Sequence, residues 1–241
     1  MYYLELLAPI IVLLSDISSS TTGIGIGIIS TSYFSLIYPP RDAVLLGLYV
    51  FTISNIFILV QFREHIDKKF VINFIPFTIP GIILGTIMLK YLEPRLIRLI
   101  FGLILLSIIA LAINKKLKIN FAERKSSMIA FASIIGITSA FMNASSPFMV
   151  ALLLSSGYSK KELVSTATAC YFINNLMKLA AFSYVGIFSA EIMKLSLYFI
   201  PFMAAGILTG KFLIEKIHAD ALRKIIFSLL STFSFGSIFG Y

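Results

Sequence analysis

The sequence predicts an all-α membrane protein, on the grounds of its composition, the length of its apolar segments and the placement of its basic residues. Hydrophobic residues make up 59% of the 241 residues, and charged residues only 13%. Soluble domains carry about 25% charged residues. The chain therefore has too little polar surface to cover a water-facing globule, and we expect lipid to surround it.

Charged breaks divide the sequence into apolar blocks, and each block is long enough to cross a bilayer. A membrane-spanning helix needs about 20 residues, at about 1.5 Å of rise for each. The eight blocks cover residues 4–37, 42–62, 69–92, 95–114, 127–157, 161–187, 190–214 and 219–240. We predict about eight transmembrane segments, or up to ten if broken helices count separately.

A repeated pattern divides the chain into two halves. The residues Ile75, Pro76, Phe77, Gly81, Ile82 and Gly85 recur 125 positions later as Ile200, Pro201, Phe202, Gly206, Ile207 and Gly210. Upstream the shift is 120 positions, and it pairs Ser19 with Ser139 and Asn55 with Asn175. We predict a first transmembrane repeat over residues 1–115, a basic cytoplasmic linker over 116–126, and a second repeat over 127–241.

The first block of each repeat is longer than one crossing and is interrupted by polar, flexible sequence. The interruption runs from Ser15 to Gly23 in the first repeat and from Gly136 to Pro147 in the second. Non-helical backbone at membrane depth occurs only where protein or a water-filled cavity satisfies its polar groups. Each block is therefore either one long tilted helix or a broken helix that forms a re-entrant hairpin.

The distribution of Lys and Arg favours the hairpins. If both long blocks cross once, the connections on the two faces carry 10 and 9 basic residues, whereas two hairpins give 14 and 5. Only the second arrangement follows the positive-inside rule. Each repeat then has an odd number of crossings, so the second repeat is inverted and both termini lie outside. Inverted repeats with broken helices are typical of secondary transporters.

The formal net charge of +9 points to a membrane surface and not to nucleic acid. The basic residues lie at helix ends, where they meet anionic headgroups, instead of forming a stripe on a soluble fold. We expect the lipid bilayer and a small anionic substrate as partners and no nucleic acid. The sequence leaves the oligomeric state open.

Catalytic and metal-binding motifs are missing from the sequence. His65 and His218 lie in connections, without Cys, His or carboxylate partners at metal-ligand spacing. The H-E-x-x-H motif of zinc proteases is absent, and no histidine lies within an apolar block to serve a serine nucleophile. We predict no metal, no cofactor and no enzymatic activity. A non-catalytic membrane subunit, or a permease for another small anion that acts with a partner, is the alternative to a stand-alone transporter.

The chain resembles the TauE/SafE family of sulfite and organosulfonate transporters over nearly its whole length. The matching residues are Gly136-Ile137-Thr138-Ser139, Ser146-Pro147, Ser165-Thr166-Ala167-Thr168-Ala169, Asn174-Asn175 with Lys178, Gly186, and the Pro-x4-Gly-x3-Gly helices at Pro76 and Pro201. The first repeat departs from the family pattern, because its glycines alternate with isoleucine and no proline follows until Pro39. The resemblance implies a plasma-membrane transporter of small sulfur-containing oxyanions.

The interruptions of the two long blocks are the first candidate for the substrate site. An oxyanion needs hydrogen-bond donors and positive potential, which the N-termini of half-helices supply. The candidate residues at these tips are Ser19, Ser20, Thr21, Thr22, Asn143, Ser145 and Ser146. Alternatively, these hydroxyl groups satisfy helix backbone, and the small side chains allow close helix packing.

Polar residues deep in apolar helices are the second candidate. Asn55 and Asn175 occupy corresponding positions in the two repeats, and Asn174 lies beside the second. Asparagine in lipid is costly without partners, so these side chains should face inward, as substrate ligands or as interhelical hydrogen bonds.

Two ionisable residues complete the candidate site. The ammonium of Lys178 would meet an anionic substrate or Asp16, or its long stem would lift it to the outer headgroups. Asp16 is the only carboxylate well inside an apolar block. It is a candidate for carrying a coupling proton, and capping of the second hairpin arm explains it equally well.

Overall fold

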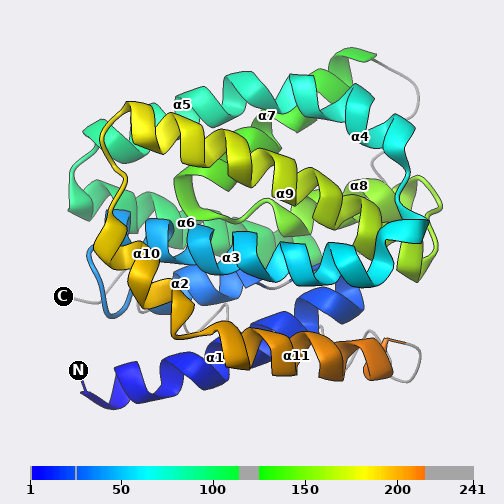
Figure 1. Ribbon diagram of the computed structural model, residues 1–241. Helices are drawn as coiled ribbons and strands as arrows, with labels where there is room; N and C mark the ends of the chain where they lie inside the picture. Colours follow the sequence, from blue (N-terminus) through cyan, green and yellow to red (C-terminus); the bar gives the residue numbers. More distant parts are fainter. Residues whose placement is uncertain (1, 25, 114–124, 215–241) are drawn as a thin grey trace.

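The computed structural model describes residues 2–24, 26–113 and 125–214, and helices are the only regular secondary structure in these segments. The all-α prediction is therefore confirmed for the described residues. Most of the long helices run along one common direction (Figure 1). The predicted block 219–240 and nearly all of the linker 116–126 lie outside the described residues.

The helices follow the predicted blocks, singly or in consecutive runs. The first half contains α1 (Tyr2–Thr22), the π-helical turn η1 (Ile26–Ser30), α2 (Thr31–Phe34), α3 (Pro40–Phe62), η2 (Arg63–His65), α4 (Lys68–Phe74), η3 (Ile75–Thr78), α5 (Ile79–Tyr91) and α6 (Pro94–Ile113). The second half contains α7 (Lys125–Met142), α8 (Ser146–Ser155), α9 (Lys160–Tyr184), α10 (Ala190–Leu197) and α11 (Ile200–Leu213).

The first helix of each half ends in the same backbone conformation. Gly23 follows α1 with φ +75°, and Asn143 follows α7 with φ +54°, so both are left-handed. Each donates its backbone N–H to the carbonyl four residues earlier, at 2.8 Å in Ser19 and 3.0 Å in Ser139. A single left-handed residue with this bond is a common helix terminator, for which glycine and asparagine are suited.

After these ends the chain folds back. Tyr33 in α2 donates its hydroxyl to the carbonyl of Leu4, near the start of α1. The ring of Phe148 in α8 lies 6.1 Å from that of Phe131 in α7. A continuous helix would place either pair about 25 Å apart or more. Both long blocks are therefore helical hairpins and not single tilted helices.

The two halves interlock through reciprocal helix packing. In Figure 1, α5 lies along α7 on one side of the bundle, and α11 lies along α1 on the other. A Cβ at Gly81 in α5 would lie 2.0 Å from the carbonyl oxygen of Ser133 in α7. A Cβ at Gly206 in α11 would lie 2.6 Å from the carbonyl oxygen of Leu13 in α1. The repeated glycines thus make the same backbone contact twice.

Helices α3 and α9 form the centre of the bundle and run in opposite directions (Figure 1). The rings of Phe51 in α3 and Tyr171 in α9 pack with centroids 5.4 Å apart. These two residues are 120 positions apart, so they correspond under the sequence repeat. The pair therefore marks the place where the equivalent helices of the two halves meet.

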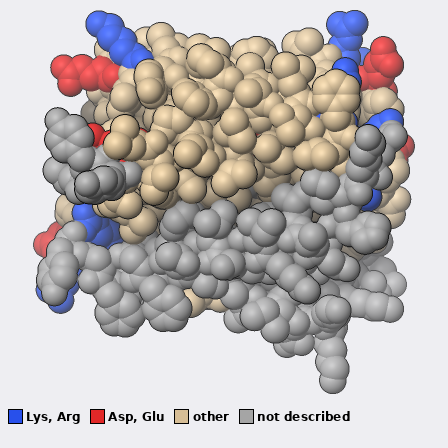
Figure 2. All heavy atoms as spheres, turned by 90° about the horizontal axis from the view of Figure 1, so that it is seen from below, with Lys and Arg blue, Asp and Glu red and all other residues tan. Residues whose placement is uncertain are grey.

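The surface suits a lipid environment. Within the described residues, three helical segments are long and apolar enough to cross a membrane, namely Leu4–Thr22, Pro40–His65 and Lys68–Tyr91, and the bent pair α10–α11 would make a fourth. Charged side chains gather at the two ends of the face in Figure 2, with an uncharged region between them. Large apolar side chains such as Val60 and Phe212, each 71% exposed, lie on the outside. This pattern is expected where lipid covers the helices.

Candidate substrate site

The two hairpin breaks meet inside the bundle. The hydroxyl oxygen of Tyr171 in α9 lies 3.3 Å from the carbonyl oxygen of Gly23 and 3.3 Å from that of Ser146. Gly27, shortly after the first break, touches the second one, because a Cβ there would lie 2.3 Å from the carbonyl oxygen of Asn143. The structure therefore brings together the two interruptions that the sequence places far apart.

Asn143 joins the two halves through its side chain. Its amide nitrogen donates to the hydroxyl of Thr31 and to the carbonyl of Val44, both at 2.9 Å. Its Oδ1 accepts from Nζ of Lys178 at 2.7 Å. The side chain is 0% exposed, and each of its polar atoms has a partner. Asn143 is thus fixed between α2, α3 and α9, and it positions Lys178.

Lys178 holds its amino group in the interior. Nζ donates to Asn143 and to the carbonyl of Ser139, at 3.2 Å, and lies 5.8 Å from the ring centroid of Phe51. The residue is 0% exposed, so the side chain does not rise to the headgroups. All three contacts are uncharged. A buried ammonium without a counter-ion is unfavourable, and an anion placed beside it would supply one.

Several buried polar groups on α3, α9 and the start of α8 have no protein partner. The unsatisfied atoms are both side-chain polar atoms of Asn55 and of Asn175, Nδ2 of Asn174, and the hydroxyl oxygens of Ser145 and Ser146. These residues are at most 2% exposed. Because buried polar groups are normally hydrogen-bonded, each unsatisfied one calls for an explanation. Most of these atoms are donors, which suits a ligand rich in acceptors.

The hydroxyl groups at the end of α1, the first hairpin tip, make hydrogen bonds within the protein. Ser20, Thr21 and Thr22 donate to carbonyls of their own helix, at 2.7, 2.7 and 2.8 Å. Ser20 also packs against α11, where a Cβ at Gly210 would lie 1.9 Å from its hydroxyl oxygen. Ser19 is buried at 2% exposure. The hydroxyls of Ser20, Thr21 and Thr22 thus satisfy helix backbone, and a role of this tip in substrate binding stays a prediction.

Asp16 is a buried carboxyl group without a hydrogen bond. It is 0% exposed, and neither of its carboxyl oxygens has a partner. The hydroxyl of Ser54 in α3 lies beside it and is also unsatisfied. Helix α11 covers it, since a Cβ at Gly206 would lie 2.8 Å from the Cβ of Asp16. Asp16 and Lys178 therefore do not form an ion pair.

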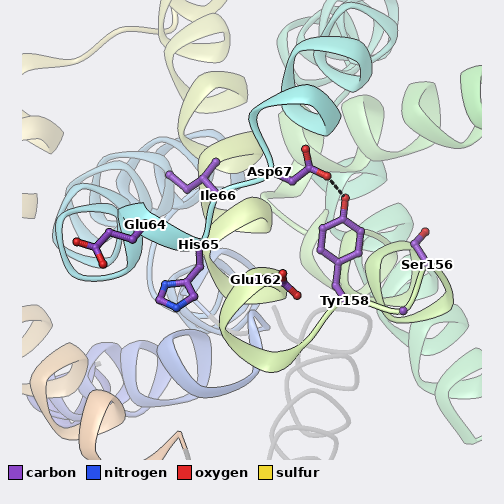
Figure 3. A pocket seen from close by; sticks show the side chains of 8 residues that line it. Glu64, His65, Ile66, Asp67, Ser156, Tyr158 and Glu162 are labelled. Atoms are coloured by element: carbon purple, nitrogen blue, oxygen red, sulfur yellow. Dashed lines mark hydrogen bonds between the residues drawn. The ribbon is translucent and has the colours of Figure 1, made fainter.

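A pocket that sequence reasoning missed lies between the α3–α4 connection and the α8–α9 connection (Figure 3). It has a volume of about 460 Å³ and is lined by Glu64, His65, Ile66, Asp67, Ser156, Gly157, Tyr158 and Glu162. The hydroxyl of Tyr158 donates to Asp67 at 2.6 Å, the dashed bond in Figure 3. This bond and the backbone N–H of Phe70 hold the pKa of Asp67 below its usual range.

Further bonds hold this end of the bundle together. The hydroxyl of Ser165 donates to the carbonyl of His65 at 2.7 Å, and the backbone N–H of Asp67 donates to the hydroxyl of Thr166 at 3.0 Å. The α3–α4 connection is thereby attached to the start of α9. Within the described ranges, no group of three or more His, Cys, Asp or Glu side chains is placed to hold a metal ion.

The family comparison covers both hairpins and the central helices. The sequence profile of the sulfite exporter TauE/SafE family matches residues 7–236. The chain belongs to the TauE/SafE family. TauE/SafE proteins are membrane transporters and not enzymes, so the predicted family and the predicted absence of enzymatic activity are confirmed. No curated protein and no solved structure matches this TauE/SafE chain.

Proposed function

We propose that this TauE/SafE protein is a secondary transporter that moves small sulfur-containing oxyanions, such as sulfite or a sulfonate, across the plasma membrane. The observation that carries the proposal is the buried amino group of Lys178, which has no counter-ion among its contacts and lies on the same helix as the unsatisfied amide of Asn175. A bound oxyanion would supply both the missing charge and the missing acceptors.

The chemistry of the second hairpin supports anion binding. Ser145 and Ser146 stand at the start of α8 with unsatisfied hydroxyls, and Pro147 is the second residue of the helix. The free N–H groups and the dipole at a helix N-terminus favour negative charge. Sulfite and sulfonate groups each present three acceptor oxygens. Charge-assisted hydrogen bonds to such oxygens are stronger than neutral ones.

The transport mechanism that we propose uses the two halves as inverted repeats, over residues 1–115 and 127–241, joined by a cytoplasmic linker over 116–126. Eight membrane segments, two of them re-entrant hairpins, would place both termini outside. The reciprocal contacts of Gly81 and Gly206 and the opposite directions of α3 and α9 support this arrangement. Movement of one repeat against the other around a central site would give alternating access.

Asp16 is the residue that we propose for proton coupling. Asp16 lies on α1 and packs against α11. Its carboxyl group is buried and has no cationic partner. A carboxyl group, unlike the hydroxyl and amide groups of the central helices, can take up and release a proton. Movement of α11 along α1 would change its surroundings, which would link proton binding to the transport cycle.

The test of transport is uptake of radiolabelled sulfite into liposomes that contain the purified chain alone. We expect saturable uptake, which Lys178→Met abolishes. Leu176→Met, at a position 46% exposed on the same helix, is the matched control and should leave uptake unchanged. No uptake by the chain alone, or uptake only after a second subunit is added, would contradict the proposal.

Proton coupling has a separate readout in the same liposomes. An imposed pH gradient should drive sulfite accumulation by the wild type. Asp16→Asn should lose this drive and retain sulfite binding, because the amide cannot bind the coupling proton. Equal gradient-driven accumulation by both proteins would remove Asp16 from the coupling step.

A further inference from the structure

The central site has the same backbone on its two sides and different side chains. The 120-residue shift pairs Asn143 with Gly23 and Lys178 with Ile58. Asn143 and Gly23 are both left-handed, and Ile58 and Lys178 are both 0% exposed. One side therefore presents an amide and an ammonium, whereas the other presents a hydrogen atom and an apolar side chain.

Lys178 supplies the cationic group of this central site. Among the described residues, it is the only fully buried Lys or Arg. The unsatisfied Nδ2 atoms of Asn55 and Asn175 and the hydroxyl of Ser146 are neutral donors. The N-terminus of α8 contributes at most about half an elementary charge. Asp16, the one fully buried Asp or Glu among the described residues, is acidic and cannot add positive charge.

On the basis of the proposed function, we infer that Lys178 makes this site selective for singly charged oxyanions over doubly charged ones of the same shape. A monoanion and one ammonium form a neutral pair, whose desolvation is offset by their attraction and by the neutral donors. A dianion leaves one negative charge uncompensated in a medium of low dielectric constant. The penalty for such a buried charge is large. The site therefore rejects sulfate, which carries two charges, and accepts oxyanions of similar shape that carry one, such as methanesulfonate.

The wild-type protein decides this inference with two tetrahedral probes, methanesulfonate and sulfate. Each competes with radiolabelled sulfite for the purified protein in detergent. We expect methanesulfonate to displace sulfite at a concentration about 100-fold lower than sulfate does. Equal potency of the two probes overturns the charge selectivity and leaves the transport proposal standing. Failure of sulfite itself to bind overturns both.

A second charge at the equivalent position sharpens the test. Ile58→Lys places an ammonium on the side that lacks one, and it should raise the affinity for sulfate relative to methanesulfonate by about tenfold or more. Ile58→Met has a similar unbranched chain without charge and should keep the wild-type ratio. If Ile58→Lys folds, as shown by a single symmetric peak in gel filtration, and keeps the wild-type ratio, the inference fails. If it does not fold, the two wild-type affinities remain decisive.

Discussion

The hairpin of the first half and that of the second half share a backbone and differ in chemistry. Both first helices end with a left-handed residue that bonds to the carbonyl four positions earlier, and both pack against a glycine-containing helix of the other half. At the first tip, the hydroxyls of Ser20, Thr21 and Thr22 are used by their own helix. At the second tip, the hydroxyls of Ser145 and Ser146 are unsatisfied.

This difference separates the parts of the molecule that hold the fold from those that we propose to bind the substrate. Gly81 and Gly206, at equivalent positions in the two halves, make helix contacts. Asn143 and Lys178, whose equivalent positions hold Gly23 and Ile58, form a hydrogen-bonded pair in the proposed site. A duplicated scaffold thus tolerates a single charged site, because one residue in each equivalent pair is free to change.

The largest effect is expected where the halves are alike. Gly81→Leu and Gly206→Leu should each destabilise the fold by about 3 kcal/mol or more, since the new side chain meets backbone that cannot move aside. Thermal unfolding in detergent measures the loss. Ala205→Leu, exposed on the same helix as Gly206, is the control and should unfold near the wild-type temperature. Wild-type stability of both glycine variants would disprove the reciprocal contacts.

The second-largest effect is expected at a position where the two halves differ. Lys178→Ala should weaken sulfite binding about 100-fold, because the anion loses its counter-ion. Ile58→Ala, at the equivalent position, should change binding little and should lower stability instead, through a cavity. Displacement of labelled sulfite and thermal unfolding distinguish the two outcomes. Equal losses of sulfite affinity in both variants would show that the two halves contribute equally to the site and would contradict this prediction.

A smaller effect is expected at the paired asparagines. Asn175→Ala should weaken sulfite binding about tenfold through loss of one hydrogen bond to a charged ligand. Asn55→Ala should have less effect, since no lysine lies one turn further on α3. The ratio of the sulfite affinities of these two variants measures how unequally the anion contacts α9 and α3. Unchanged affinity in both would remove the asparagines from the site.

The smallest effect is expected at the end of the bundle. Tyr158→Phe removes the hydrogen bond to Asp67 and should lower stability by about 1 kcal/mol near neutral pH. The lowered pKa of Asp67 means that this stabilisation is present above the pKa of the unfolded chain and is lost as the pH falls through the folded value. Thermal unfolding of both proteins should therefore converge in acid.

The control for this variant comes from the first half. Tyr38 corresponds to Tyr158 under the 120-residue shift. Tyr38→Phe leaves the bond to Asp67 in place, so its unfolding temperature should keep the pH dependence of the wild type. A difference between Tyr158→Phe and the wild type that persists at low pH would contradict the role of the Asp67 carboxylate.

Much of the fold could be predicted from the sequence, because the fold depends on hydropathy and small residues. Apolar blocks between charged breaks predicted where the helices lie, and the repeated Gly81 and Gly206 predicted equivalent packing. The placement of Lys and Arg favoured hairpins, which the contacts of Tyr33 and Phe148 bear out. The number of spans and the inversion of the repeats stay predictions, since they depend on where the membrane lies.

The details of the site were less accessible from sequence. Serine and threonine bind a helix carbonyl or a ligand with the same hydroxyl chemistry, so the sequence could not separate Ser20 from Ser146. The role of Asn143 depends on Thr31 and Val44, which are remote in the chain. The bond between Tyr158 and Asp67 joins two connections whose composition gives no signal of their proximity.

The packing of α1 against α11 also has a consequence for biosynthesis. Helix α1 leaves the ribosome long before α11, yet α11 is the helix that covers Asp16. Until α11 is inserted, a carboxyl group of α1 faces lipid or another temporary neighbour. The packing of α1 around Asp16 can therefore be completed only after α11 has been synthesised and inserted.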